Sequence, residues 1–380
     1  MSLSRFSRRD FSRTIGRSLA LALAAPRLSA ALAAPLPSDA VAGEIRLNGN
    51  ENPYGPSPKA LEALAACGTS ACRYPNAAQS SVRETIARLH GVKPENIVLG
   101  CGSSEILRIA ELAFLSPGQN AVAAEPTFEA VLSYARVTRA EPVKIPLTAD
   151  YRHDLPRMAA ACTSKTALVY VCNPNNPTGT TVHPEQMKEF VQRVPPTTLI
   201  LVDEAYHHFP DGSDYASLTG WINDHPNIVV TRTFSKVYGL AGMRLGYGIG
   251  TKETISRMSA HTLGNSCNSA VLPAALAALA DVDYAETCRS RINATRRWLM
   301  GELAKDGRGY TNSQANFLMI DMGIDVTPII EQFRARNILV GRRFPSMKNF
   351  LRVTIGTQPE TESFLAALRE IAPARVTKAA

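Results

Sequence analysis

Short apolar segments that alternate with helical patterns are the feature that most constrains how this chain folds. Six such segments occur, at Asn96–Gly100, Ala121–Ala124, Ala167–Cys172, Thr198–Val202, Ile228–Thr231 and Leu245–Gly250. Segments this short and this apolar are typical of strands buried on both faces. Amphipathic patterns such as Ser104–Leu115 and Pro184–Val194 lie between several of them. The alternation predicts an α/β fold with a largely parallel sheet covered on both faces, and a ligand site at the carboxyl ends of the strands.

The last third of the chain has a different pattern. Ala274–Asp306 is helical, in one segment or two, and a final helix closes the chain. Between them we expect a strand at Asn316–Met322, a helix near Thr327–Arg336 and a strand at Leu351–Ile355. This mixture predicts a smaller α+β domain.

The first 34 residues are typical of an export signal rather than of a folded segment. Ser7–Phe11 (Ser-Arg-Arg-Asp-Phe) resembles a twin-arginine signal, and Arg13 closes its basic region. An alanine-rich apolar run follows, and Ala31–Ala33 is a small-residue cleavage site. The alternatives are an amphipathic helix or a basic tail. Because twin-arginine transport carries folded proteins, we expect folding, with the loading of any cofactor, in the cytoplasm and a periplasmic or secreted mature protein.

Charge and cysteine content exclude several classes of protein. The net charge is +8, but residues 1–34 supply +5 of it, so the remainder gives no basis for nucleic-acid binding. No uncharged apolar stretch of about 20 residues is present, so no stable membrane span is expected. The seven cysteines do not form a disulfide framework, although Cys67 and Cys72 could pair in an oxidising compartment. No spacing of cysteine and histidine fits a zinc site.

A lysine ends the segment Thr231–Lys236 (Thr-Arg-Thr-Phe-Ser-Lys). A lysine that forms a Schiff base must lose its proton, and burial with neighbouring cations lowers its pKa. The hydroxyls of Thr233 and Ser235, together with Arg244, can surround a dianionic phosphate. A lysine in a loop is more often simply solvated, so this interpretation needs support from other segments.

An acidic pair, Asp203 and Glu204, follows the fourth apolar segment. A carboxylate at a buried strand end is costly unless a cation partners it. A protonated pyridine nitrogen is such a partner, and its protonation makes the ring an electron sink. Tyr206 can then donate to the phenolic oxygen of that cofactor. Two alternatives stay open: Asp203 can cap the next helix, or the pair can bind a metal, although no further ligands are suitably spaced.

Two more segments place polar groups after strands. Asn173–Gly179 (Asn-Pro-Asn-Asn-Pro-Thr-Gly) is a stiff turn by composition, and the Asn176 amide can also bond the phenolic oxygen. Gly100–Glu105 (Gly-Cys-Gly-Ser-Ser-Glu) joins a strand to a helix, whose N-terminal N–H groups would face a phosphate. It lacks the third glycine of a dinucleotide fingerprint, which disfavours a nicotinamide cofactor.

These four segments, in this order, resemble the fold-type I aminotransferases that use pyridoxal 5′-phosphate (PLP), and most closely the histidinol-phosphate aminotransferase family. The resemblance extends from about residue 45 to 372 and includes Asn50–Pro56 (Asn-Glu-Asn-Pro-Tyr-Gly-Pro) and Leu351–Thr357 (Leu-Arg-Val-Thr-Ile-Gly-Thr). It implies a homodimer with shared active sites. The implied domains are an arm with part of the small domain (35–72), a large PLP-binding domain with a mostly parallel sheet (73–283), and a small α+β domain (284–380).

The resemblance also implies roles for individual residues. Lys236 would be the Schiff-base lysine and the base that moves a proton between Cα and C4′, and Asp203 would pair with the pyridinium. Tyr206 and Asn176 would contact the phenolic oxygen, and Phe128 would stack on the ring unless it is a core aromatic. The implied phosphate contacts are Gly102, Ser103, Thr233, Ser235 and Arg244. Tyr74 would contact the phosphate of the neighbouring subunit. Arg352 would clamp the substrate α-carboxylate with its guanidinium fork, and Asn316 and Tyr54 would lie nearby.

One segment departs from that family. Val340–Pro345 (Val-Gly-Arg-Arg-Phe-Pro) replaces a Val-Arg-Pro-type segment and a longer loop, a region that contributes to recognition of the substrate phosphate in the family. Histidine biosynthesis is also cytoplasmic, whereas export is predicted here. We therefore expect a ping-pong aminotransferase that acts on an amino acid, or a histidinol-phosphate-like amine, and a 2-oxo acid, with the substrate pair left open.

Other functions stay possible on the same scaffold. It also supports decarboxylases, carbon–sulfur lyases and cyclases, because the bond held perpendicular to the cofactor ring decides the reaction. A binding module that holds PLP without turnover is a different class. The intact set of Lys236, Asp203 and Tyr206 disfavours it.

Overall fold

The structure is a computed structural model that describes residues 43–373, except for the side chain of Thr69. The predicted export signal, residues 1–34, lies outside the described residues. In the described part, strands and helices alternate from β1 (Ile45–Leu47) to the final helix α13 (Gln358–Ile371). The final helix is therefore confirmed.

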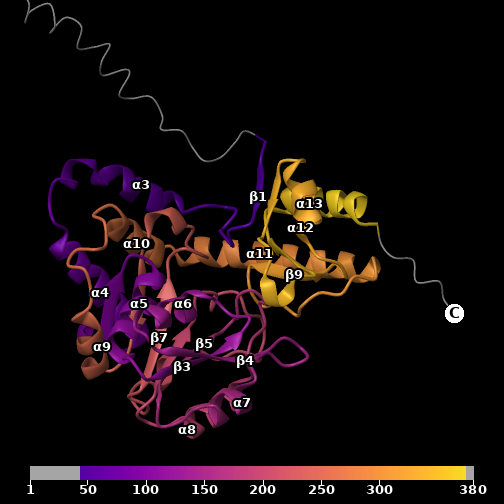
Figure 1. Cartoon of the computed structure of the whole chain (residues 1–380). Coiled ribbons are helices and arrows are strands. Elements are labelled where there is room, and N and C mark those ends of the chain that lie inside the picture. Colours follow the sequence, from indigo (N-terminus) through magenta and orange to yellow (C-terminus); the bar gives the residue numbers. More distant parts are fainter. Residues whose placement is uncertain (1–42, 374–380) are drawn as a thin grey trace, which may run out of the picture. The chain divides into compact units, whose positions relative to one another are not determined.

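A seven-stranded sheet is the centre of the fold (Figure 1). Its strands, in spatial order, are β2 (Ile97–Gly100), β8 (Gly246–Ile249), β7 (Ile228–Thr233), β6 (Leu199–Asp203), β5 (Thr166–Cys172), β3 (Asn120–Glu125) and β4 (Glu141–Pro146). All six predicted strands are confirmed, and β8 alone runs in the direction opposite to the other six strands of this sheet. The prediction of a largely parallel sheet is therefore correct, and β4 is the strand that it missed.

Successive residues of the central strands enter two different apolar cores. On β5, Val169 and Val171 pack into one core, whereas Leu168 and Tyr170 pack into the other. This division follows from the two-residue period of a strand, and it explains why β5 is apolar over most of its length. The first core is covered by α3 (Pro58–Ala66), α4 (Asn76–His90), α7 (Leu155–Ala160), α8 (Pro184–Arg193) and α10 (Val271–Ala280). The second is covered by α5 (Ser103–Phe114), α6 (Ala130–Val137) and α9 (Lys252–Ser259).

The C-terminal third forms a third apolar core with the first strand of the chain. It contains two two-stranded sheets, one of β1 with β10 (Ile338–Val340) in parallel and one of β9 (Phe317–Asp321) with β11 (Phe350–Thr354) in antiparallel. The helices are α11 (Val282–Lys305), α12 (Thr327–Arg334) and α13. Figure 1 shows the indigo strand β1 beside these orange and yellow elements. The predicted strands at 316–322 and 351–355 and both predicted helices are confirmed, and the long helical stretch is two helices, α10 and α11.

Other sequence predictions can be compared with the described residues. The boundary between 283 and 284 falls inside α11, so the proposed domain limits stay a prediction. Cys67 and Cys72 are both free thiols, and the Cys67 thiol lies 3.7 Å from the Ser269 hydroxyl. Within residues 43–373 no helix is long and apolar enough to cross a membrane. The same part of the chain contains no cluster of three or more residues that could hold a metal ion.

Glu111 on α5 is a destabilising residue of the second core. Its side chain is 0% exposed, and neither carboxylate oxygen has a hydrogen-bond partner among the described residues. Burial raises the pKa of Glu111 to about 9, although Arg108 opposes this. The folded state therefore keeps a proton that the unfolded chain loses above about pH 4.5, so stability falls as pH rises from there toward 9.

We expect Glu111→Gln to stabilise the protein, and to do so more at pH 8 than at pH 5. The difference in the free energy of unfolding between Glu111→Gln and the wild type, measured in urea, should grow by up to about 1.4 kcal/mol per pH unit. Glu62→Gln, an exposed position on α3, is the matched control and should have no such effect. An equal effect of Glu111→Gln at both pH values would show that the carboxyl is ionised in the folded state.

Candidate active site

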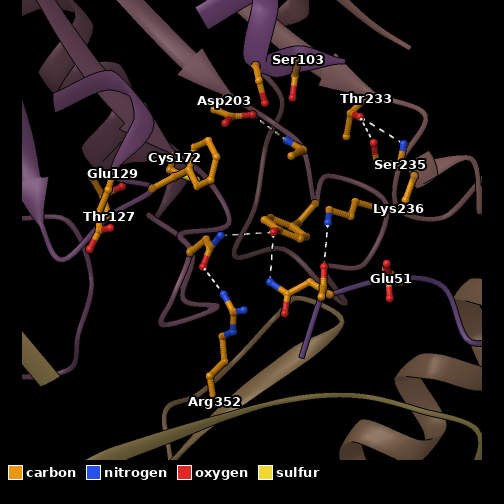
Figure 2. Close-up of a pocket in the computed structure, with 18 of the residues that line it drawn as sticks. Glu51, Ser103, Thr127, Glu129, Cys172, Asp203, Thr233, Ser235, Lys236 and Arg352 are labelled. Atoms are coloured by element: carbon orange, nitrogen blue, oxygen red, sulfur yellow. Dashed lines mark hydrogen bonds between the residues drawn. The ribbon is translucent and has the colours of Figure 1, made fainter. Parts of the chain in front are cut away.

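A cavity of about 510 Å³ opens at the carboxyl edge of the seven-stranded sheet. Its wall is built from residues that end or follow five strands that run in one direction, namely Ser103 after β2, Phe128 after β3, Asn176 after β5, Asp203 on β6 and Lys236 after β7. Figure 2 shows Ser103, Asp203 and Lys236 around the cavity. Because β8 is antiparallel, its first residues lie at the same edge, which brings Arg244 to the cavity. Strand direction therefore assembles residues that are widely separated in sequence.

Most of the predicted site residues line this cavity. They are Ser103, Phe128, Asn176, Asp203, Tyr206, Thr233, Ser235, Lys236, Arg244 and Arg352. Gly102 precedes Ser103 with φ +75°, and a Cβ there would overlap the Arg244 guanidinium. A glycine is therefore required where this turn meets the arginine.

Besides Gly102, three further predicted residues do not line the cavity. Asn316 is fully buried behind it and donates to the backbone carbonyls of Asn50 and Glu51 at 3.1 and 3.2 Å. Tyr54 faces the C-terminal elements, where Arg291 lies over its ring. Tyr74 is 81% exposed, and its predicted contact with a neighbouring subunit stays a prediction.

Asp203 is a buried carboxylate without a cationic partner. It is 3% exposed, and no ion pair in the described part of the chain includes it. Its Oδ1 accepts from the Ala205 amide and the Thr231 hydroxyl, both at 3.1 Å, and its Oδ2 accepts from the Tyr170 hydroxyl at 3.0 Å. Burial raises the pKa of Asp203, while these donors and Lys236 oppose that effect. A protonated nitrogen in the cavity would supply the missing positive charge.

The Lys236 Nζ lies over the ring of Tyr206, 5.4 Å from the ring centroid. Its ammonium group donates to the Gly49 carbonyl at 3.4 Å (Figure 2). Burial, followed by the nearby Arg352, lowers the pKa of Lys236 to about 8, although Glu51 and Asp203 oppose this. A neutral amine is therefore accessible near physiological pH, as a nucleophilic lysine requires.

The Tyr206 hydroxyl is surrounded by side-chain amides. Asn50 donates to it from Nδ2 at 3.1 Å, and Asn176 donates from Nδ2 at 3.4 Å. The Asn176 Oδ1 accepts from Arg352 at 2.9 Å (Figure 2), and the second Arg352 nitrogen donates to the Asn48 carbonyl at 2.8 Å. Arg352 and Lys236 thus contact consecutive carbonyls, those of Asn48 and Gly49.

One part of the cavity wall consists of hydroxyl groups and a cation. Thr233 donates to the Ser235 hydroxyl at 2.9 Å, and Arg244 approaches that hydroxyl at 3.4 Å. No carboxylate in residues 43–373 pairs with Arg244. Ser103 begins α5, whose N-terminal N–H groups favour an anion. At Gly246 any Cβ would overlap the Ser103 backbone, so this approach of β8 to α5 requires glycine.

Several wall residues carry no predicted role. Among them are Glu51, Glu129, Arg342 and Phe344. Glu51 belongs to the segment Asn50–Pro56, and Arg342 and Phe344 belong to Val340–Pro345. The sequence motifs therefore indicated these segments but gave no role to these three residues. The glycine at position 341 is explained by close packing, because a Cβ there would lie 2.8 Å from the Cβ of Arg352.

The cavity fits PLP at three separate points. The uncompensated Asp203 matches a protonated pyridine nitrogen, the hydroxyls with Arg244 match a phosphate, and the lysine of lowered pKa matches the aldehyde. Together with a mostly parallel sheet that presents them at its carboxyl edge, these matches define a fold-type I PLP-dependent enzyme.

Comparisons with known proteins identify the family. The family model described as aminotransferase class I and II matches residues 42–368. The histidinol-phosphate aminotransferase of Moorella thermoacetica is 38% identical over 330 residues, which are 86% of this chain and 85% of that protein. That of Brevibacillus brevis is 37% identical over 333 residues, covering 86% and 90%. The structure of the Sinorhizobium meliloti enzyme in complex with PLP superposes with a TM-score of 0.81 at 28% identity, covering 87% and 90%.

The chain therefore belongs to the aminotransferase class I and II family. It is a PLP-dependent aminotransferase, as the order of its sequence motifs indicates.

Proposed function

We propose that this aminotransferase takes an α-amino acid as donor, that Arg352 holds its α-carboxylate, and that a 2-oxo acid is the acceptor in a ping-pong reaction. The observation that carries this proposal is the position of Arg352. Its guanidinium lines the cavity that contains Lys236, and the two side chains contact consecutive backbone carbonyls. A carboxylate on Arg352 would therefore place the adjacent Cα near Lys236.

In the proposed mechanism, PLP supplies an electron sink for the bond at the substrate Cα. Lys236, once free of the cofactor, would take the Cα proton and deliver it to C4′, which suits an amine of lowered pKa. Asp203 would keep the ring nitrogen protonated. Tyr206 and Asn176 would hold the phenolic oxygen, and Phe128 would cover the ring and keep water away.

A phosphate-bearing amine is the second candidate donor. The relatives are named histidinol-phosphate aminotransferases, and Arg342 gives this cavity another cation. Glu129 pairs with Arg342 at 2.6 Å, so a phosphate would have to displace this carboxylate. Comparing kcat/KM for glutamate and for histidinol phosphate separates the candidates, since only one should approach 10⁴ M⁻¹s⁻¹ or more.

We expect Arg352→Ala to raise KM for amino-acid donors by roughly two orders of magnitude, with a smaller effect on kcat. Arg352→Lys, which keeps the charge but loses the fork, should lie between the wild type and the alanine variant. Steady-state kinetics with glutamate measure both parameters. An unchanged KM in the alanine variant would remove Arg352 from carboxylate binding.

We also propose a homodimer in which Tyr74 reaches the phosphate site of the partner. The support is its 81% exposed ring, which lies outside the cavity of its own chain. Mixing Tyr74→Ala with Lys236→Ala subunits should restore activity, because one site of each hybrid dimer then has both native residues. No gain on mixing, or a monomer in sedimentation, would contradict this arrangement.

For localisation we propose twin-arginine export to the periplasm or beyond. The support is the segment Ser7–Phe11 with the alanine-rich run after it. Replacing Arg8 and Arg9 together by lysine should retain the protein in the cytoplasm, as cell fractionation would show. Unchanged distribution would exclude this route.

A further inference from the structure

Asn50 connects three segments that are far apart in sequence. It is 2% exposed and has a φ of +52°, a left-handed conformation that asparagine tolerates better than most residues. Its carbonyl accepts from Asn316 at 3.1 Å, and its Nδ2 donates to the Tyr206 hydroxyl at 3.1 Å. The third contact is to Thr354 on β11, two residues after Arg352.

Thr354 fixes which way the Asn50 amide points. The Asn50 backbone N–H donates to the Thr354 Oγ1 at 2.9 Å, so that oxygen already accepts a hydrogen bond. The Thr354 hydroxyl in turn donates to the Asn50 Oδ1 at 3.3 Å. With its oxygen held by Thr354, the amide can only present its NH₂ group to Tyr206.

We infer that Asn50 and Thr354 are positioning residues that force the Tyr206 hydroxyl to donate its proton into the cavity. Both amides next to this hydroxyl, those of Asn50 and Asn176, are donors to its oxygen. A hydroxyl has one hydrogen, and neither neighbouring amide can accept it. The hydrogen therefore points at the phenolic oxygen of PLP, and this inference rests on the proposed role of Tyr206 there.

The hydrogen bond from Tyr206 determines in which direction the titration midpoint of the cofactor's visible band shifts when the bond is lost. A donor to the phenolic oxygen stabilises its negative charge, which weakens its hold on the proton of the nitrogen that joins Lys236 to the cofactor. The pH at which the visible band of the lysine-linked cofactor titrates is thereby kept low. Loss or reversal of the Tyr206 donor should raise that midpoint.

The test is a spectrophotometric pH titration of the holoenzyme. Asn50→Asp keeps the size of the side chain and the tolerance of positive φ. It replaces the amide donor with a carboxylate, which accepts a hydrogen bond from the Tyr206 hydroxyl. Thr354→Val keeps the shape of Thr354 and removes its hydroxyl, and Thr354→Ser restores that hydroxyl. Tyr206→Phe serves as the reference for complete loss of the donor.

We expect the midpoint to rise by about one pH unit or more in Asn50→Asp and in Tyr206→Phe. It should rise by less in Thr354→Val and keep the wild-type value in Thr354→Ser. Wild-type midpoints in Asn50→Asp and Thr354→Val, beside a shifted Tyr206→Phe, would overturn the inference and leave the role of Tyr206 intact. An unshifted Tyr206→Phe would overturn both the role and the inference. Thr354→Val gives its own result should Asn50→Asp not fold.

Discussion

Replacing Lys236 with alanine is expected to lower kcat by a factor of about 10⁴ or more, because it removes both the covalent attachment of the cofactor and the base. We expect the alanine variant to keep the cavity, since within residues 43–373 the side chain of Lys236 makes one hydrogen bond, to the Gly49 carbonyl. It should therefore still bind PLP, but without a borohydride-reducible bond. Single-turnover kinetics and mass spectrometry after reduction measure the two effects.

The matched control is Lys252→Ala, an exposed position in the first turn of α9. This variant should keep the wild-type kcat and the reducible cofactor bond. Turnover by Lys236→Ala at more than about one hundredth of the wild-type rate would assign the proton transfer to another group.

Asp203→Asn is expected to lower kcat by about 10²–10³, the loss that follows when one preorganised electrostatic contact at the reacting group is removed. The substitution keeps the size of the side chain, but it removes the negative charge that would hold the ring nitrogen protonated. Its NH₂ group also faces a donor in either orientation, namely the Tyr170 hydroxyl at the Oδ2 position, or both the Thr231 hydroxyl and the Ala205 amide at the Oδ1 position. We expect weaker PLP retention on dialysis as well.

Tyr170→Phe separates charge from hydrogen bonding at Asp203. It removes one donor at 3.0 Å and keeps the carboxylate. We expect its kcat to fall by less than about tenfold, the effect of one ordinary hydrogen bond. Equal losses in Tyr170→Phe and Asp203→Asn would mean that the geometry of the carboxylate, rather than its charge, is what catalysis requires.

Six strands of the central sheet could be predicted because they are buried on both faces, so most of their residues are apolar. β4 could not be found in this way. It is the edge strand Glu141–Pro146, none of whose residues is fully buried, and it contains Pro142 and Pro146. Such a segment is typical of a loop, and only its pairing with β3 makes it a strand.

The site residues that follow strands could be predicted because strand direction alone brings them together. Asn316 and Tyr54 were assigned from motifs, but a motif does not determine which side of the backbone faces a cavity. Asn50 could not be given a role either. Its partners Tyr206 and Thr354 lie 156 and 304 residues away, and that proximity exists only in the fold.

The most direct test of the account is an absorption spectrum of the purified protein, taken before and after addition of single amino acids. We predict a visible band from PLP linked to Lys236, lost on borohydride reduction, which one amino acid converts to the absorption of the amine form of the cofactor. That conversion would identify both transamination and the donor. A band that no amino acid converts would contradict transamination, and no band even after incubation with PLP would contradict the cofactor site itself.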